Sequence, residues 1–521
     1  MRENRVSMLA GHPRGFYVIV LTEVWERFSF YGMRALLVFY MVRHFQLTES
    51  EAVGVYASYA SLLYLTPIIG GYVADRILGL RTAVISGALL MTAGHFAMAF
   101  EGSGGAIVGG KLVRDAAGEA VVYLALSLIA VGNGLFKPSL SSLLGLLYDK
   151  SDSRRDAGFT LFFIGVNVGT AAAALVCGYL GEVYGWRYGF GAAGVGMLSG
   201  LAIFWLRGPA DHRVQNLSRD VPATHRITAV VLVIAALAAS WHLIQSRQLV
   251  GLLLAAGCVV TFAVLIWAAV TRLNADERTR VFTLLSFAVV SVIYWALEDQ
   301  SATSINLLTH HFVERDVLGI TVHASQYLAL APLFVIALGP AVSSWWQRID
   351  SRGRPAGTAA KFAVGMALVG LGYILLGLPA LLHADSERIS AWWLIVSYAF
   401  HALGTLCVVP ICLAQVTLLA PAAWASVLIG VWYLSVAVGF ALSGSVAQFA
   451  LTAESGESTL SGYGIAFVAM AAASLVVAVG MKMVSGRVRV IEDRQRQVRS
   501  NSAEARSESG GIPVERSAVS S

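Results

Sequence analysis

The chain has 521 residues, of which 57% are hydrophobic and only 13% are charged, and its mean hydropathy is +0.69. A soluble globular protein carries about 25% charged residues, so this composition excludes the soluble class and indicates an integral membrane protein. The positive residues behind the net charge of +6 cluster between the apolar segments, so the charge does not indicate a nucleic-acid partner.

Apolar runs of about twenty residues, the length that the core of a bilayer requires, recur along the whole chain. They predict fourteen transmembrane helices, over residues 16–40, 52–73, 82–100, 121–140, 158–180, 188–206, 227–245, 249–271, 281–301, 325–346, 360–382, 391–415, 425–448 and 462–484. The predicted fold class is therefore an all-α polytopic membrane protein.

The first run contains four ionisable residues: Glu23, Glu26, Arg27 and Arg34. At about 100° per residue they fall on one face of a helix, which Tyr31 widens only slightly. A charged side chain at the centre of a membrane helix costs about 2.5–3.5 kcal/mol, so this face is expected to point into the protein or a hydrated cavity. Such a face indicates a transporter that pairs proton movement with a small polar solute.

The division of the chain follows from the helix number. The seventh and eighth runs are uniformly apolar, and without them six helices remain on each side, the plan of many two-bundle transporters. We therefore expect an N-terminal bundle over residues 1–208, an inserted transmembrane hairpin over 209–279 and a C-terminal bundle over 280–484. Residues 485–521 are rich in Arg, Ser and Glu, and predict a disordered tail whose arginines touch anionic lipid.

The arginines between the runs predict the orientation. Alternate loops are rich in arginine and lysine, whereas the opposite loops mix fewer of them with acids, so both termini are expected in the cytoplasm.

Three motifs coincide along the chain: EVWERFSFY at residues 23–31, GGYVADRILGLRT at 70–82 and FFIGVNVGT at 162–170. The segment GNGLFKP at 132–138 accompanies them. Together they resemble the proton-dependent oligopeptide transporter (POT) family of the major facilitator superfamily, in its bacterial fourteen-helix form. The resemblance covers about residues 12–484, and implies the major facilitator fold and a location in the bacterial inner membrane.

The resemblance implies roles for individual residues. Glu23, Glu26 and Arg27 would couple protonation to substrate binding. Lys137 and Arg34 would bind the carboxylate end of a peptide. Further pocket positions are Tyr31, Tyr64 and Asn167, and the loop residues Gly70, Gly71, Asp75 and Arg76 would form a conformational latch.

On the ninth run, the segment YWALEDQ (294–300) resembles a family pattern of aromatic residues followed by an acid. Asp299 stands where the family usually has glutamate, and would couple protons, contact the substrate and pair with Arg34 in a gate. Trp295 would form a wall of the pocket. Glu298 is an open alternative as the working acid. For Trp432, a pocket wall and simple core packing are equally good interpretations.

Two positions depart from the family. Thr405 stands where peptide-transporting relatives usually have an acid, which would bind the amino group of the peptide, and Ala331 stands where an asparagine is common. The leading hypothesis is a proton-coupled symporter that imports di- or tripeptides or peptide-like solutes by alternating access. The alternative is a carrier of the same fold for an anion or another polar metabolite.

No motif indicates an enzyme, and the four cysteines all lie in apolar segments, which predicts neither disulfides nor a metal site. The expected partners are therefore a small-molecule substrate, protons and membrane lipid, with the proton gradient in place of a cofactor. We expect a monomer.

Overall fold

The computed structural model describes residues 11–148, 152, 154–208, 223–351, 356–384, 388–421, 424–452 and 458–509. Each of the fourteen predicted spans falls on a long helix, so the all-α polytopic fold is confirmed. The first six helices are α1 (Arg14–Arg43), α2 (Glu49–Val73), α3 (Leu80–Met98), α4 (Ala116–Leu146), α5 (Arg154–Tyr184) and α6 (Trp186–Arg207). The remaining elements are α8 (Ala223–Gln245), α9 (Arg247–Arg272), α10 (Ala275–Glu298), α11 (Ser304–Phe312), α12 (Leu330–Asp350), α13 (Thr358–Leu382), α14 (Ala391–Leu419), α15 (Ala425–Thr452) and α16 (Leu460–Ser509).

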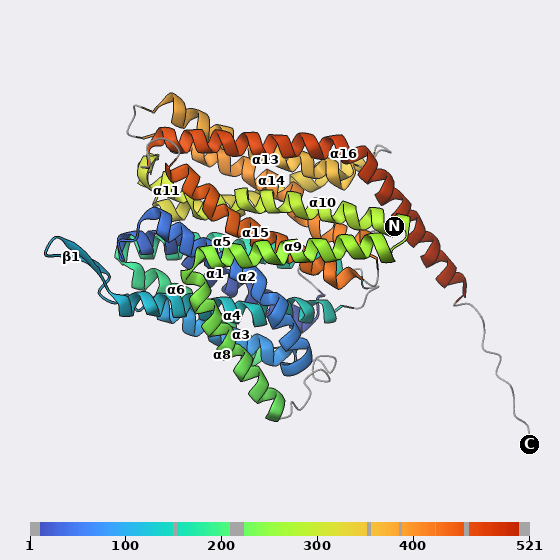
Figure 1. Cartoon of the computed structure of the whole chain (residues 1–521), viewed down its shortest axis with the longest axis horizontal. Coiled ribbons are helices and arrows are strands. Elements are labelled where there is room, and N and C mark those ends of the chain that lie inside the picture. Colours follow the sequence, from blue (N-terminus) through green and yellow to red (C-terminus); the bar gives the residue numbers. More distant parts are fainter. Residues whose placement is uncertain are drawn as a thin grey trace, which may run out of the picture.

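Short elements join the long helices. A π-helical turn at Ala74–Leu78 extends α2, and 3₁₀ turns at Asp299–Ala302 and Ala324–Ala329 flank α11. Two small antiparallel hairpins pair β1 (Gly105–Val108) with β2 (Lys111–Arg114), and β3 (Asp316–Val317) with β4 (Ile320–Thr321). The β1–β2 hairpin projects from the end of the molecule opposite to the last turns of α16 (Figure 1).

Twelve helices of the described part are long and apolar enough to cross a membrane on length and composition alone. Helix α1 is not among them because of its four charged residues, and Arg81 and His95 lower the hydropathy of α3. Both nevertheless pack among the other long helices, α1 against α5 and α6, and α3 against α4 and α6. Side-chain caps mark where helices begin: Thr48 and Glu51 form a capping box at α2.

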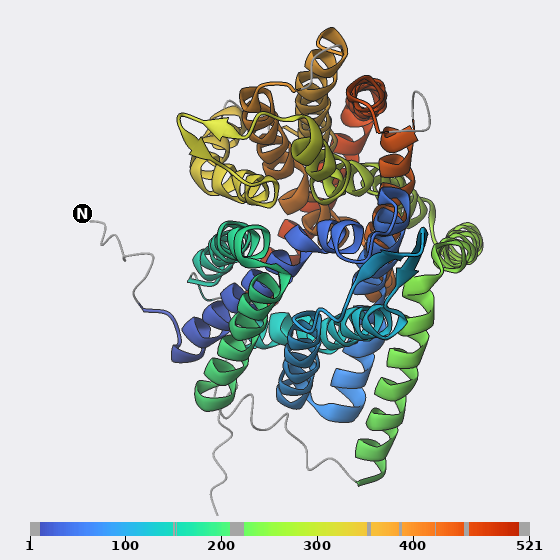
Figure 2. The same ribbon diagram turned by 90° about the vertical axis from the view of Figure 1, so that its left-hand side faces the viewer.

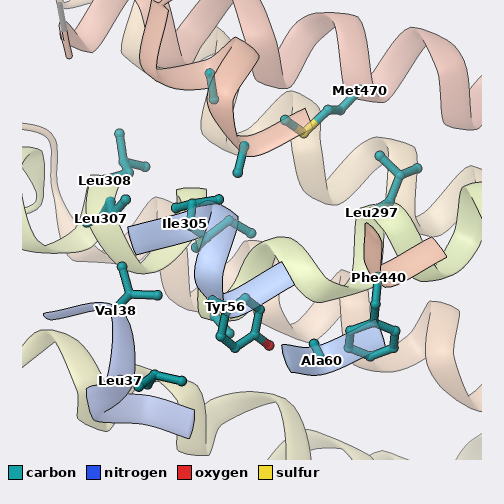
Figure 3. Close-up of a cluster of buried hydrophobic side chains, with 14 of the residues drawn as sticks. Leu37, Val38, Tyr56, Ala60, Leu297, Ile305, Leu307, Leu308, Phe440 and Met470 are labelled. Atoms are coloured by element: carbon teal, nitrogen blue, oxygen red, sulfur yellow. The ribbon is translucent and has the colours of Figure 1, made fainter. Parts of the chain in front are cut away.

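Helices α1–α6 gather on one side of the molecule and α10–α16 on the other (Figure 2). The two groups touch where α2 packs on α15 and where α5 packs on α12. At one end, Leu37 and Tyr56 of the first group pack in the same buried cluster as Leu297, Ile305 and Phe440 of the second (Figure 3). Burial of apolar side chains from both groups holds this end together.

Apart from α2, which both of them contact, helices α8 and α9 pack against different helices. Helix α8 packs on α4 and α2, whereas α9 packs on α15, α2 and α10. At the joint between them, Arg247 donates to Ser445 Oγ at 2.5 Å and to Gln448 of α15. Gln448 in turn donates to the backbone oxygen of Ser50 in α2, at 3.1 Å. The inserted pair therefore bridges the two helix groups.

The prediction of a disordered tail from residue 485 is wrong as far as Ser509, because α16 continues to that residue. Glu492 is only 1% exposed. Its carboxylate accepts from the backbone nitrogen of Thr358 at 3.3 Å and from Gln415 Nε2 at 3.0 Å. Polar composition gave no sign of this, since the hydrogen bonds of Glu492 and a few apolar side chains, Val488 and Ile491, dock the extension. Residues 510–521 lie outside the described residues, and lipid contact stays a prediction.

Replacing Gly70 with alanine should destabilise the protein, because a Cβ atom there would lie 2.1 Å from the backbone oxygen of Gly134 in α4. Overpacking of this kind costs about 1–3 kcal/mol. Thermal unfolding in detergent measures it, with Gly71→Ala as the matched control, since its nearest neighbour, Pro138, would lie at an ordinary 3.5 Å. Equal melting temperatures for the two variants would contradict the close approach of α2 and α4.

Candidate functional site

The acids and Arg27 of α1 form a buried network with Lys137 of α4. Glu26 accepts two hydrogen bonds from Arg27, at 2.6 and 2.8 Å, and Arg27 also lies 3.4 Å from Glu23. Lys137 Nζ contacts Glu23 Oε1 and lies 3.2 Å from Glu26 Oε2. The side chain of Glu26 is fully buried and that of Glu23 is 3% exposed. The two carboxylates therefore share two cations, and all four charges compensate one another.

A second buried pair joins α1 to the end of α10. Arg34 Nη2 donates to Asp299 Oδ1 at 2.5 Å, and Arg34 Nε donates to the Tyr56 hydroxyl at 2.8 Å. The same hydroxyl donates to Asp299 Oδ1 at 2.7 Å. Asp299 is only 1% exposed, so its charge depends on Arg34 for compensation. The structure thus brings Arg34 and Asp299 together, beside the buried apolar cluster that joins the two helix groups.

Tyr56 is a site residue that the sequence motifs did not predict. It lies two helical turns before Tyr64 on α2, so the spacing places both tyrosines on the same face. That spacing could have pointed to it.

A cavity of about 210 Å³ lies between the two helix groups, next to the Arg34–Asp299 pair. Six of the predicted site residues line it: Tyr31, Arg34, Tyr64, Asn167, Trp295 and Asp299. Glu298, Thr405 and Ala331 also line it, together with Tyr294 and Tyr398. Residues from α1, α2, α5, α10, α12, α14 and α15 therefore meet at one site.

Two predicted substrate contacts lie elsewhere. Lys137 is turned toward the α1 acids and is not on the cavity wall, nor are Glu23, Glu26 and Arg27. Trp432 packs against two buried apolar clusters, in keeping with the core-packing interpretation. A role for Lys137 in substrate binding stays a prediction.

Aromatic rings form much of the wall. The ring of Phe440 stacks on Tyr64 at 4.7 Å and on Trp295 at 6.0 Å between centroids. The guanidinium groups of Arg27 and Arg34 lie 5.7 and 5.4 Å from the ring centre of Tyr31. Cations at such distances from an aromatic face are attracted to it. Tyr31 therefore connects the two ion-pair networks along α1.

The predicted latch lies at the end of α2, away from the cavity wall. Gly70 and Gly71 face α4, whereas Asp75 and Arg76 are exposed. Neither of these two charged side chains has an ion-pair partner within the part of the chain that the structure describes. Their role in conformational change stays a prediction.

Comparison with known proteins agrees with this geometry. A sequence model of the POT family matches residues 81–460. An uncharacterized transporter of Bacillus subtilis is 33% identical over 450 residues, which cover 84% of this chain and 88% of the relative. A di-/tripeptide transporter of Lactococcus lactis is 33% identical over 460 residues, covering 84% and 89%. Among solved structures, a mutant of peptide transporter POT crystallised with alafosfalin superposes with a TM-score of 0.79 at 32% identity, covering 93% of this chain and 96% of that one.

Replacing Asp299 with asparagine should lower the stability of the protein by on the order of 3 kcal/mol, because it leaves the buried Arg34 without its counter-charge. Thermal unfolding of the purified protein measures the change. Glu298→Gln is the matched control on the same helix end, since Glu298 has no arginine or lysine partner among the described residues, and should cost much less. A loss of equal size in the two variants would contradict the role of the ion pair.

Proposed function

The chain belongs to the POT family of transporters, and we propose that it imports di- or tripeptides or peptide-like solutes together with protons, by alternating access. The observation that carries this proposal is the cavity between the two helix groups, which is walled by aromatic rings and flanked by two buried networks of ion pairs. Buried ionisable residues in a membrane protein mark substrate and proton pathways. Energy comes from the proton gradient, without a cofactor.

The Arg34–Asp299 pair acts as a gate in this proposal. It joins α1 to the end of α10, so the helix groups cannot separate there without breaking the pair. Protonation of Asp299 would remove the charge that attracts Arg34, and a protonated carboxyl costs less to leave unpaired in a buried site than a carboxylate. Proton binding would thereby favour opening of this end.

The network of Glu23, Glu26, Arg27 and Lys137 supplies a second coupling point. Lys137 belongs to α4 and the other three residues to α1, so their pairing depends on how these helices are placed. Protonation of Glu23 would weaken its attraction to Lys137 and free the ammonium for a carboxylate of the substrate. We place the protein in the bacterial inner membrane with both termini in the cytoplasm, as a monomer.

A carrier of anions is the less favoured function. It rests on Thr405 and Ala331, both of which line the cavity. The relatives with a functional name, however, include di-/tripeptide transporters and a dipeptide and tripeptide permease.

Purified protein in liposomes should accumulate labelled dialanine when an inward proton gradient is imposed, and should only equilibrate it without one. Glu23→Gln should abolish the accumulation but retain exchange of labelled for unlabelled dialanine, because an amide cannot release a proton. Asp493→Asn, which neutralises a half-exposed carboxylate on α16 outside the cavity, should behave as wild type. Accumulation that does not depend on the gradient would contradict proton coupling.

A further inference from the structure

Among the described residues, the carboxylate of Glu298 accepts a hydrogen bond only from one neutral hydroxyl, that of Thr405. Its Oε1 accepts from the hydroxyl of Thr405 at 3.2 Å, and the same Thr405 oxygen accepts from the hydroxyl of Tyr294 at 3.1 Å. Its Oε2 is buried and has no hydrogen-bond partner among the residues that the structure describes. Within 4.0 Å, the one basic group among the described side chains is the His401 ring, with Nδ1 at 4.0 Å from Oε2. Arg34 also lines the cavity but binds Asp299. The hydroxyl chain orients the carboxylate without neutralising it.

The ion pairs of α1 with α4 and with the end of α10 leave Glu298 without a cation of its own. Glu23 and Glu26 share Arg27 and Lys137, and Asp299 binds Arg34. Of these four acids, Glu298 alone has no arginine or lysine within 4.0 Å among the described side chains. Three cations therefore face four carboxylates.

The fold itself gives no reason for a negative charge at this point. Glu298 is the last residue of α10, where the partial negative charge of the helix C-terminus opposes a carboxylate. A lone carboxylate inside a membrane protein is costly. Because it lines the cavity, the missing positive charge can come from whatever occupies that cavity.

The position of Thr405 indicates which cation that is. The resemblance implied that an acid at this position would receive the amino group of a peptide. Here a threonine occupies the position, but its hydroxyl holds the carboxylate of Glu298 from the neighbouring helix. In this part of the cavity, α10 therefore supplies the carboxylate and α14 the hydroxyl that holds it.

We propose that Glu298 binds the primary ammonium group of the substrate, with Thr405 and Tyr294 as positioning residues. Glu298 thereby sets the specificity of the site for solutes with a free amino group, while Asp299 pairs with Arg34. This inference rests on the proposed function and defines its substrate class further. It also gives the two adjacent acids separate roles: Glu298 binds the substrate, and Asp299 pairs with Arg34.

The test compares the affinities of dialanine and N-acetyl-dialanine, measured by thermal shift of the purified protein and by competition in the liposome assay. Wild type should prefer dialanine by about 10- to 100-fold, the effect of one hydrogen bond to a charged group. Glu298→Gln should lose this preference. The variant Glu298→Gln/Thr405→Glu, which returns an acid to α14, should recover it. Glu314→Gln, which removes an exposed carboxylate outside the cavity, should keep the wild-type preference.

The outcomes separate this inference from the proposed function. Transport of dialanine by wild type together with an unchanged preference in Glu298→Gln would overturn the inference and leave the function standing. If wild type carries no dipeptide, the proposed function fails, and thermal shifts with primary amines and their acetylated forms still decide the inference. Equal shifts for both members of each pair in wild type would overturn it. A melting temperature of ligand-free Glu298→Gln close to that of wild type shows that the fold is intact.

Discussion

Charges buried inside a membrane protein must be compensated, and this constraint determines how the helices around the cavity are arranged. Glu23 and Glu26 on α1 bind Lys137 from α4, and Arg34 binds an acid at the end of α10. Breaking one such pair leaves an uncompensated charge at a cost of about 3–5 kcal/mol. Helix α1 is therefore tied to its neighbours by electrostatics as much as by apolar packing.

In the proposed mechanism, the same constraint couples protonation to a conformational change. The pair between Arg34 and Asp299 crosses between the two helix groups, beside an apolar cluster to which both contribute. The other buried acids, Glu23, Glu26 and Asp299, are paired with cations of the protein without any ligand. Glu298 accepts only from the neutral hydroxyl of Thr405 among the described residues, which leaves it available for a cation of the substrate. In this account a proton releases one end of the cavity, and a substrate supplies the charge that the cavity lacks.

The sequence predicted the helices and the inward-facing charges of α1 for a simple physical reason. Apolar runs must span the bilayer, and charged residues such as Arg34 must point into the protein. Pocket positions such as Asn167 came instead from the resemblance to the POT family. The sequence does not predict contacts between segments that are far apart along the chain. The hydrogen bonds of Tyr56, the bridging contacts of Arg247 and the docking of Glu492 all depend on helices that meet only in three dimensions. For the same reason, the sequence shows that Thr405 stands where relatives usually have an acid, but not that its hydroxyl contacts the carboxylate of Glu298.

We propose that the buried carboxylates of Glu23, Glu26 and Asp299 carry protons inward together with the substrate. Luminal pH in liposomes that hold the purified protein and start at equal pH inside and outside tests it most directly. Addition of dialanine outside should acidify the lumen as the dipeptide enters down its own gradient, because each transport cycle delivers a proton. Entry of dialanine at an unchanged luminal pH would contradict the account.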